Sequence, residues 1–419
     1  MPPLQAQSLN SSRRFFLARL FFALIIFLMS LAATTNARAG ERVLHSFVGG
    51  RDGNNPTAPV ILVNGNMYGT TSSGGRYCAG TVYEMKRTNR GWKETMLYHF
   101  TGGSDGYHPY GGLVADESGN LYGTTMLGGA HDRGTIFELS RGSDGKWNES
   151  VLYNFCSLPR CDDGEGPYSG LTWDNAGNLY GTTSETVFQL SPSASGWTLT
   201  TIYTFNGNGV YGADSPLLVD ASGNLYGNAS YGGNCDWCGA VFELSPSGAS
   251  WSYATLYNFN DGADGGVPRG QLLMDKNSNI YGTTAFVGST QCLDAGIGCG
   301  VVFELSPAGG TWVETVLYTF TADGDGTYPT SVVFAPGGSL YGTTNLGGTG
   351  HCQNTGCGTI FKLTQSGGTW KESVRFSFRG ANGYQPQSGA LTTDSHGRLY
   401  GTTVLGGKIN HGTLYEFKP

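Results

Sequence analysis

The chain repeats one short phrase seven times, and this repetition constrains its fold more than any other feature. The phrase reads NLYGTT at residues 120–125 and again at 178–183, and close variants complete the set. Successive copies are 46 to 60 residues apart, a spacing typical of architectures in which each repeat forms one supersecondary unit. The tyrosines of the seven copies are Tyr68, Tyr122, Tyr180, Tyr226, Tyr281, Tyr341 and Tyr400.

Each repeat contains four short apolar runs, which predict four β-strands. In the repeat at 111–155 these runs are LVAD, NLYGTT, GTIFEL and WNESVLYNF, called strands a to d in chain order. The chain has 68 glycines, and Gly-rich turns between aromatic and β-branched runs favour short, tightly joined strands. A four-stranded antiparallel unit of this kind is the blade of a β-propeller. In six repeats a tryptophan opens strand d, and we interpret these as packing between repeats: Trp92, Trp147, Trp197, Trp251, Trp312 and Trp370.

The two ends of the repeat array predict a closed ring. The strand-d phrase, for example LYNF at 152–155, ends six repeats, and a seventh copy, VLHSF, stands alone at 43–47. The last repeat stops after strand c. The N-terminal strand can therefore complete the last blade and remove the edges that an open array would expose. We predict an all-β fold over residues 40–419: a seven-bladed β-propeller of four-stranded antiparallel blades.

Residues 1–39 have the three parts of an export signal peptide. Arg13 and Arg14 precede an apolar run at 20–33, and ARA at 37–39 supplies a small-residue cleavage site. The apolar run is too short for a comfortable membrane span, so no stable span is expected after cleavage. The arginine pair is similar to a twin-arginine motif, and the sequence leaves that route and the general secretory route open. We expect a periplasmic or extracellular protein.

The charge of the mature chain excludes one class of partner. Cleavage after residue 39 removes four arginines and no acidic residue, which changes the net charge from −7 to −11. An acidic chain without a basic stripe is a poor match for a phosphate backbone, so we expect no nucleic-acid partner. We expect the protein to be a monomer.

The repeat unit reads DxxGNLYGTTxxGGxxxxGTVFEL…WxExxLYxF…DGxxP. This pattern resembles the GloVer tandem repeat, found in bacterial exported proteins described as choice-of-anchor tandem-repeat proteins. The resemblance covers residues 41–419 and implies a propeller-like exported protein, and it brings no activity and no catalytic residues. The chain departs from the family label, because no anchor follows YEFKP at 415–419 and no cysteine follows the signal to accept lipid. The sequence therefore does not support surface tethering, unless the N-terminal segment stays uncleaved.

The d–a and b–c connections emerge on one face of a propeller, and here they vary in length and hold nearly all the unusual residues. Function on such scaffolds usually lies in variable loops, so we place any site on this face, near the mouth of the central channel. Close cysteine pairs in these loops predict disulfides in an exported protein, with a redox or zinc pair as the alternative for CDWC at 235–238. Cys78 is left over as a candidate free thiol. The predicted disulfides are Cys156–Cys161, Cys235–Cys238, Cys292–Cys299 and Cys352–Cys357.

An aspartate recurs in the DGxxP segment of the d–a loops, and two interpretations stay open. The carboxylates could ring the channel mouth and bind a ligand or Ca²⁺, because these loops are rich in oxygen. Alternatively, Asp-Gly simply forms the turn. Single histidines in the b–c loops are interpreted as exposed residues, and no other metal site and no cofactor are predicted. The candidate ligand-binding aspartates are Asp105, Asp163, Asp264 and Asp325.

Two further features of this face are candidates for function. The d–a loop at 156–167 is the longest of its kind, and the blade that it enters has almost no b–c loop. The resulting notch is a candidate ligand groove, although the long loop could equally fill the gap. Asp163 and Glu165 in this loop are the candidate catalytic pair if the protein is an enzyme. Trp237, between Cys235 and Cys238, is a candidate for stacking on a sugar or contacting a partner.

The sequence favours an exported, non-catalytic β-propeller binding scaffold whose ligand is a glycan or an extracytoplasmic protein. It contains no nucleophile elbow, phosphate-cradling loop or metal-ligand motif. The alternative is a secreted polysaccharide lyase or glycoside hydrolase that uses carboxylates on the d–a/b–c loop face. A structural component of the cell envelope, without a small ligand, is a third hypothesis.

Overall fold

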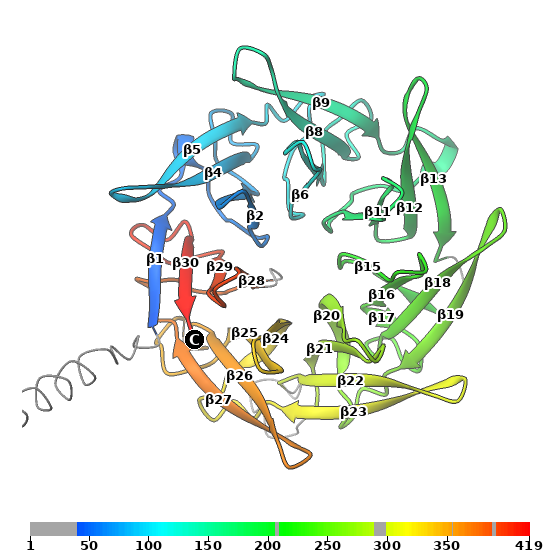
Figure 1. The fold of residues 1–419 in the computed structure, drawn as a ribbon, viewed down its shortest axis with the longest axis vertical. Helices are drawn as coiled ribbons and strands as arrows, with labels where there is room; N and C mark the ends of the chain where they lie inside the picture. The colour runs from blue at the N-terminus through cyan, green and yellow to red at the C-terminus, as the bar shows by residue number, and fades with distance from the viewer. Residues whose placement is uncertain (1–39, 206–208, 289–298, 354, 388–390) are drawn as a thin grey trace, which may run out of the picture.

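A computed structural model of the chain describes residues 40–205, 209–288, 299–353, 355–387 and 391–419. In these residues seven four-stranded antiparallel sheets stand around a central axis (Figure 1). Each sheet presents the first strand of its repeat to the axis and the strand-d segment to the outside. The predicted all-β, seven-bladed propeller is confirmed.

The innermost strands differ most in length between blades, from 2 residues in the second blade to 9 in the fifth. The first three blades comprise β2 (Ile61–Val63), β3 (Asn66–Thr71), β4 (Thr81–Thr88) and β5 (Gly91–His99); β6 (Val114–Ala115), β7 (Leu121–Thr125), β8 (Thr135–Arg141) and β9 (Trp147–Asn154); and β10 (Thr172–Trp173), β11 (Leu179–Thr182), β12 (Thr186–Ser193) and β13 (Gly196–Thr204). The next three comprise β15 (Leu218–Val219), β16 (Leu225–Ala229), β18 (Ala240–Ser247) and β19 (Ser250–Asn258); β20 (Gly266–Met274), β21 (Ile280–Phe286), β22 (Val301–Ala308) and β23 (Thr311–Thr319); and β24 (Thr327–Ala335), β25 (Ser339–Leu346), β26 (Thr359–Ser366) and β27 (Thr369–Ser377). The last blade comprises β28 (Thr392–Thr393), β29 (Leu399–Thr403), β30 (Thr413–Lys418) and β1 (Gly40–Ser46). The loops add a two-stranded pair, β14 (Val210–Tyr211) with β17 (Tyr231–Gly232), and two single-turn 3₁₀ helices, η1 (Gly50–Asp52) and η2 (Pro159–Cys161).

The ring is closed by the first strand of the chain. β1 pairs antiparallel with β30, from Gly40 opposite Lys418 to Ser46 opposite Thr413. The last blade thus takes its outermost strand from the N-terminal end of the propeller and the other three from the C-terminal end, as the sequence predicts. Because both ends share one sheet, the ring cannot open without breaking these backbone hydrogen bonds.

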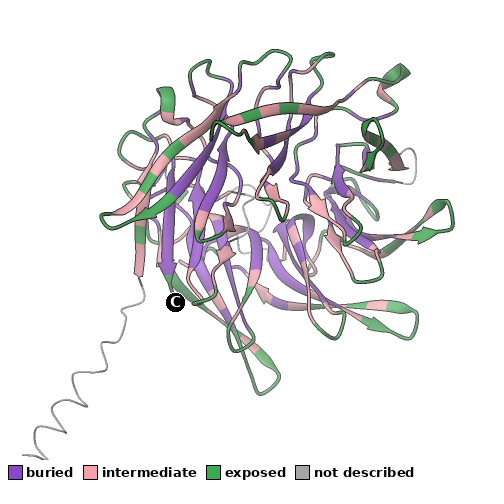
Figure 2. Cartoon of the chain, turned by 45° about the horizontal axis from the view of Figure 1, so that its top comes forward, coloured by how far each residue is buried: buried purple, intermediate pink, exposed green. Residues whose placement is uncertain are grey.

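The hydrophobic core is divided into seven clusters, each between two neighbouring blades. Figure 2 shows buried residues concentrated on the middle strands of the blades, with exposed residues on the outer strands and turns. The tyrosine of strand b packs with the tryptophan that opens strand d of the next blade. The rings of Tyr68 and Trp147, for example, are 6.3 Å apart between centroids. All six of these tryptophans pack against such an inter-blade cluster, which confirms their predicted role.

Contacts in the second repeat explain why the NLYGTT phrase recurs. The hydroxyl of Tyr122 donates a hydrogen bond to Asp116 in the a–b turn, at 3.2 Å. Gly123 lies opposite Phe137, and a Cβ atom at this glycine would stand 2.7 Å from the phenyl ring. The hydroxyl of Thr124 donates to a backbone carbonyl of the next blade at 2.9 Å. The phrase is therefore scaffold, because it closes a turn, admits a buried ring and joins two blades.

Three of the four predicted disulfides lie within the described residues, and all three are formed: Cys156–Cys161, Cys235–Cys238 and Cys352–Cys357. The disulfide interpretation of CDWC is thus confirmed. Cys299 is also disulfide-bonded, whereas its predicted partner Cys292 lies outside the described residues. Cys78 is exposed and is the one free cysteine in the part of the chain that the structure describes.

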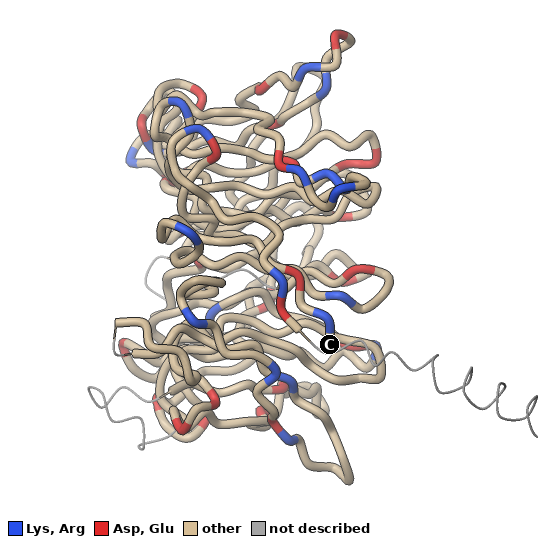
Figure 3. The backbone as a smooth tube through the Cα atoms, turned by 90° about the vertical axis from the view of Figure 1, so that its left-hand side faces the viewer, with Lys and Arg blue, Asp and Glu red and all other residues tan. Residues whose placement is uncertain are grey.

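In the view of Figure 3, the positions of basic and acidic residues are interspersed along the chain instead of separating into bands of one sign. In the described ranges no helix is long and apolar enough to cross a membrane. The export signal predicted at 1–39 lies outside the described residues and stays a prediction.

Candidate ligand-binding site in the central channel

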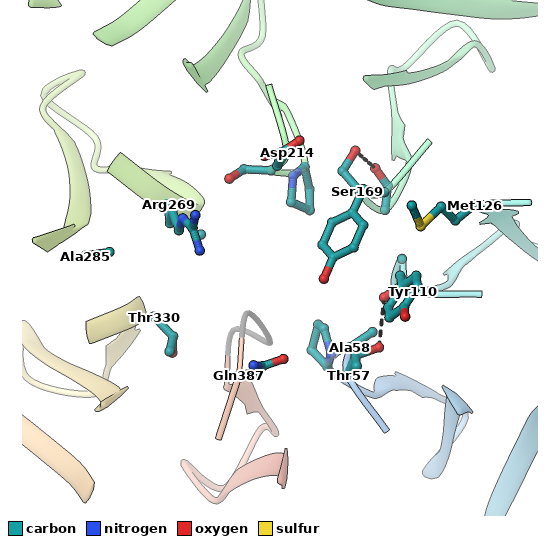
Figure 4. Close-up of a pocket in the computed structure, with 18 of the residues that line it drawn as sticks. Thr57, Ala58, Tyr110, Met126, Ser169, Asp214, Arg269, Ala285, Thr330 and Gln387 are labelled. Carbon is teal, nitrogen blue, oxygen red and sulfur yellow. Dashed lines mark hydrogen bonds between the residues drawn. The ribbon is translucent and has the colours of Figure 1, made fainter. Parts of the chain in front are cut away.

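A cavity of about 720 Å³ lies in the central channel. All seven blades contribute to its wall, and their side chains point toward the axis from every side (Figure 4). The lining comes mainly from d–a and b–c connections and from the adjoining ends of inner strands. The volume falls in the range of small-molecule sites. The cavity therefore opens on the loop face where the sequence analysis placed any site.

Seven lining residues occupy the same position in the seven repeats. In six repeats this residue directly follows the proline of the DGxxP segment or of its variant, and in the fourth repeat Ala213 replaces the proline. The side chain at this position differs widely in polarity and charge from one blade to the next. We call these residues the channel ring: Thr57, Tyr110, Tyr168, Asp214, Arg269, Thr330 and Gln387.

A preceding proline fixes six of the seven channel-ring residues at the rim. Pro109, just before Tyr110, lies against Gly80 of the preceding blade, where a Cβ atom would be 2.5 Å from the proline ring. The same contact recurs between Pro167 and Gly134. Gly80 has a φ of +102°, which few other residues tolerate, and proline has a fixed φ of its own. Together they set the backbone direction, so the next side chain reaches the channel.

One side of the cavity is aromatic. The rings of Tyr110 and Tyr168 stack with their centroids 4.9 Å apart and their planes at 23°. The series continues through His108, which stacks on Tyr107 at 3.6 Å. His108 is held in place because its Nδ1 lies 2.7 Å from the carbonyl oxygen of Ser72. Tyrosine presents an apolar face and a polar tip, a combination suited to the faces and hydroxyls of sugar rings.

Among the described residues, two basic and two acidic side chains also line the cavity, so the charges of this described lining balance. Arg133 and Glu165 form an ion pair with 3.3 Å between Nη1 and Oε2. Asp214 and Arg269 are neighbours in the channel ring. Burial raises the pKa of Asp214, and the positive charge of Arg269 partly offsets this effect. A lining without net charge favours a ligand without net charge.

Arg269 links the cavity to a group of exposed aromatic residues. Its Nη2 donates a hydrogen bond to the hydroxyl of Tyr231 at 3.2 Å. The ring of Tyr231 stacks on that of Tyr211 and meets Trp237 edge-on, with centroids 5.4 and 5.3 Å apart. Tyr211 and Trp237 are 49% and 57% exposed. We call Tyr211, Tyr231 and Trp237 the aromatic ledge; Trp237 does not line the cavity itself.

The four predicted ligand-binding aspartates do not line the cavity. Each instead accepts hydrogen bonds from the tyrosine of the preceding strand d and from backbone N–H groups of its own loop. For Asp105 the donors are the Tyr98 hydroxyl at 2.9 Å and the Thr101 N–H at 2.8 Å. These contacts support the turn interpretation of DGxxP. No group of three potential metal ligands within the described residues includes any of the four. The other three with equivalent contacts are Asp163, Asp264 and Asp325.

The long loop at 156–167 reaches the cavity, but it does not assemble the predicted catalytic pair. Glu165 lines the cavity, and so does Ser184 in the short b–c connection of the same blade. Asp163 is fully buried and accepts hydrogen bonds from Tyr153 and Leu158, so it holds the loop in place. Residues of both the long loop and the short b–c connection thus line the cavity, as the groove interpretation requires.

The channel ring escaped the sequence analysis although the sequence contains its signal. The aspartate of DGxxP recurs in most repeats, and a residue needed in nearly every blade is usually part of the scaffold. The informative position is the variable one that follows a recurrent proline. Its side chains converge on one axis only when the ring is closed.

Two groups of described residues bring three potential metal ligands together. One contains Cys156 and Cys161, whose sulfurs are joined in a disulfide and so cannot bind metal as thiolates. The other consists of His45, Asp52 and Glu94, which lie at the closure of the ring and do not line the cavity.

The protein is a seven-bladed propeller with a cavity on its loop face. A comparison with known families agrees with the repeat. The Gloeobacter/Verrucomicrobia repeat matches residues 25–186, 185–313 and 295–419. The chain therefore belongs to the family built from this repeat, and the resemblance stated from the sequence is confirmed. No curated protein matches the chain significantly.

Several solved structures are similar in fold. One is a putative 6-phosphogluconolactonase from Bacteroides fragilis, at 12% identity and a TM-score of 0.48, covering 88% of each chain. Another is PorZ, a surface component of the type-IX secretion system of Porphyromonas gingivalis, at 15% identity and 0.49, covering 88% of this chain and 47% of that one. A third is an aldose sugar dehydrogenase from Streptomyces coelicolor, at 11% and 0.43, covering 91% and 99%. Similarity at this level does not bear on function.

Proposed function

We propose that this protein is an exported, non-catalytic binding propeller that takes a neutral oligosaccharide into its central cavity. The observation that carries the proposal is the stacked pair Tyr110 and Tyr168 in the wall of a cavity with balanced charges. Threonine and glutamine in the channel ring add hydrogen-bonding groups for sugar hydroxyls. The disulfides in the loops are consistent with export to the periplasm or the extracellular space.

The test is binding of a panel of neutral and charged oligosaccharides to the purified protein, followed by calorimetry and thermal shift. A ligand that binds only the folded state raises Tm by mass action, with about 2.7 kcal/mol of added stability at a hundredfold excess over Kd. We expect one neutral glycan class to give a saturable shift. Tyr110→Ala and Tyr168→Ala should each weaken that binding about tenfold or more, because the aromatic face is lost.

Tyr77→Ala is the matched control for these variants. Tyr77 is 50% exposed and does not line the cavity, so its replacement should leave glycan binding unchanged. Binding that all three variants weaken equally would place the site elsewhere. No saturable shift with any glycan would overturn the proposal and favour an extracytoplasmic protein as the ligand.

One observation favours the enzyme alternative as a second candidate. Asp214 lines the cavity and burial raises its pKa, which is the condition of a carboxyl group that acts as a general acid. Glu165 is the other carboxylate in the described part of the lining. Product analysis of any bound glycan tests this candidate. Turnover that Asp214→Asn abolishes while binding persists would establish a hydrolase or lyase, and intact glycan after long incubation would exclude it for that glycan.

A further inference from the structure

The ring-closing strand carries a histidine where the other repeats carry an aromatic ring. The second residue of the LYxF phrase is tyrosine in five repeats and phenylalanine in a sixth, but β1 has His45 there. In the next interface the hydroxyl of the equivalent Tyr98 donates a hydrogen bond to Asp105. His45 takes the same place beside Asp52, and a neutral imidazole nitrogen, unlike a protonated tyrosine, is also a good metal ligand.

His45 lies between two carboxylates that belong to different parts of the ring. Its Nε2 is 3.3 Å from Oδ2 of Asp52 and 3.3 Å from Oε1 of Glu94. One potential ligand atom from each of the three residues falls within 4.8 Å of the others. Asp52 ends η1, in the connection from β1 to the first blade, and Glu94 lies on β5. The side chains are only 21%, 15% and 14% exposed.

Hydrogen bonds do not satisfy this group. A single Nε2–H can donate to only one of the two carboxylates at a time. Oδ1 of Asp52 and Oε1 of Glu94 are buried and have no hydrogen-bond partner among the described residues. Leaving such oxygens unpaired is costly, and a cation between Oδ2 of Asp52 and Oε1 of Glu94 would satisfy the glutamate oxygen. Oδ2 of Asp52 also accepts a hydrogen bond from the Val48 N–H at 3.0 Å.

The unpaired glutamate oxygen by itself does not distinguish this interface. Glu149, Glu314 and Glu372 also have a buried Oε1 without a hydrogen-bond partner among the described residues, and each lies beside a tyrosine in place of histidine. The imidazole is what sets the ring closure apart, because it adds a nitrogen ligand to two carboxylates. The other interfaces therefore serve as internal controls.

We propose that His45, Asp52 and Glu94 bind one divalent transition-metal ion, best matched by Zn²⁺, and that this ion stabilises the closed ring. Bonds of about 2.0–2.2 Å to nitrogen and oxygen in a tetrahedron separate the ligand atoms by about 3.3–3.5 Å. The two distances from Nε2 have this length. One imidazole and two carboxylates suit Zn²⁺, and water would complete the four ligands. The ion would join β1 of the last blade to β5 of the first.

The experiment is calorimetric titration of Zn²⁺ into the purified, EDTA-treated protein without a histidine tag, with Ca²⁺ titrated in parallel. We expect one Zn²⁺ per chain, a Tm that rises with Zn²⁺ concentration, and much weaker binding of Ca²⁺. With Co²⁺ in place of Zn²⁺, visible absorption bands of tetrahedral strength should appear.

His45→Tyr is the decisive variant, because it installs the residue that most other repeats carry and should therefore fold. It should weaken Zn²⁺ binding at least a hundredfold, as should Asp52→Asn and Glu94→Gln, whose shapes are conserved. Glu149→Gln at the next interface is the control and should bind Zn²⁺ like the parent. The absence of stoichiometric binding, binding that His45→Tyr leaves unchanged, or an equal loss in Glu149→Gln would each overturn the proposal.

Discussion

Gly123 stands opposite Phe137 in the second blade, and the phenyl ring occupies the space that a side chain at this position would need. The same steric relation recurs in the other blades, for example between Gly282 and Phe303. A buried ring under each NLYGTT phrase therefore requires glycine at the fourth position of that phrase. The requirement is one of space rather than of backbone conformation, since Gly123 does not have a positive φ.

Gly123→Ala should destabilise the protein by about 1–3 kcal/mol, because the added methyl group overpacks a filled interface. Urea unfolding followed by tryptophan fluorescence measures the change. Gly103→Ala is the matched control, because its nearest neighbour is the Thr101 hydroxyl at 3.4 Å in an exposed loop. Equal stability of the two variants would contradict the steric explanation.

At the scale of the element, several outermost strands carry a glutamate that faces the DGxxP aspartate of a neighbouring d–a loop. Glu149 on β9 is half-buried, and burial is the main cause that raises its pKa to about 7, with the nearby charge of Asp105 adding to it. Glu314 on β23 and Glu372 on β27 have the same environment and pKa values of about 7. The folded state thus favours the protonated carboxyl group at each of these three strands.

These glutamates should make the protein less stable as pH rises from about 5 to 8. Their pKa values are raised above the ordinary 4.5, so the stability that they contribute is complete below pH 4.5 and is lost as pH rises through about 7. We expect the triple change Glu149→Gln, Glu314→Gln and Glu372→Gln to flatten the dependence of Tm on pH in this window. A variant with the parental slope would show that the carboxyl groups titrate normally.

Acidic residues of the a–b turns act in the opposite direction at lower pH. Hydrogen bonds from the turn backbone and from Arg398 lower the pKa of Asp394 against the effect of burial, and Asn178 does the same for Asp174. Their contribution is present above the ordinary pKa of 3.8 and is lost as pH falls below it. The glutamates thus lower stability at higher pH and the aspartates lower it at lower pH. These pH ranges are separate, so stability should be greatest between them.

At the scale of the whole molecule, closure depends on seven residues at the N-terminal end of the propeller. β1 supplies the outer strand of the last blade, and Phe47, just after it, is fully buried in the cluster between the last and first blades. Without β1, the outward edge of β30 would lose its partner, and the cluster would lose one wall.

Deletion of residues 40–47 should cost far more stability than any single substitution, and it should cause aggregation through the exposed β30 edge. Size-exclusion chromatography and urea unfolding measure both effects. A synthetic peptide of residues 40–49 should restore part of the stability when added in trans. A deletion variant that stays monomeric and unfolds at the parental urea concentration would contradict the role of β1.

Much of the fold was predictable because its determinants are local and repeated. The four strands at 113–155 were placed within about two residues of their observed bounds, since apolar runs, Gly-rich turns and the Trp signal all agree. The cysteine pairs were predictable because each closes within one short loop. The candidate site was predicted only as a face of the molecule. The aspartates chosen for it hold their own loops, whereas Tyr110, Tyr168 and Arg269 line the cavity.

The sequence by itself determined the blade, the number of blades and the strand that closes them, because these follow from periodicity and turn chemistry within each repeat. Only the tertiary structure decided which side chains share a site. Residues such as Thr57 and Arg269 are more than two hundred positions apart, and they meet across the channel because seven sheets wrap around one axis. His45, Asp52 and Glu94 likewise converge only where the closed ring brings its last and first blades together.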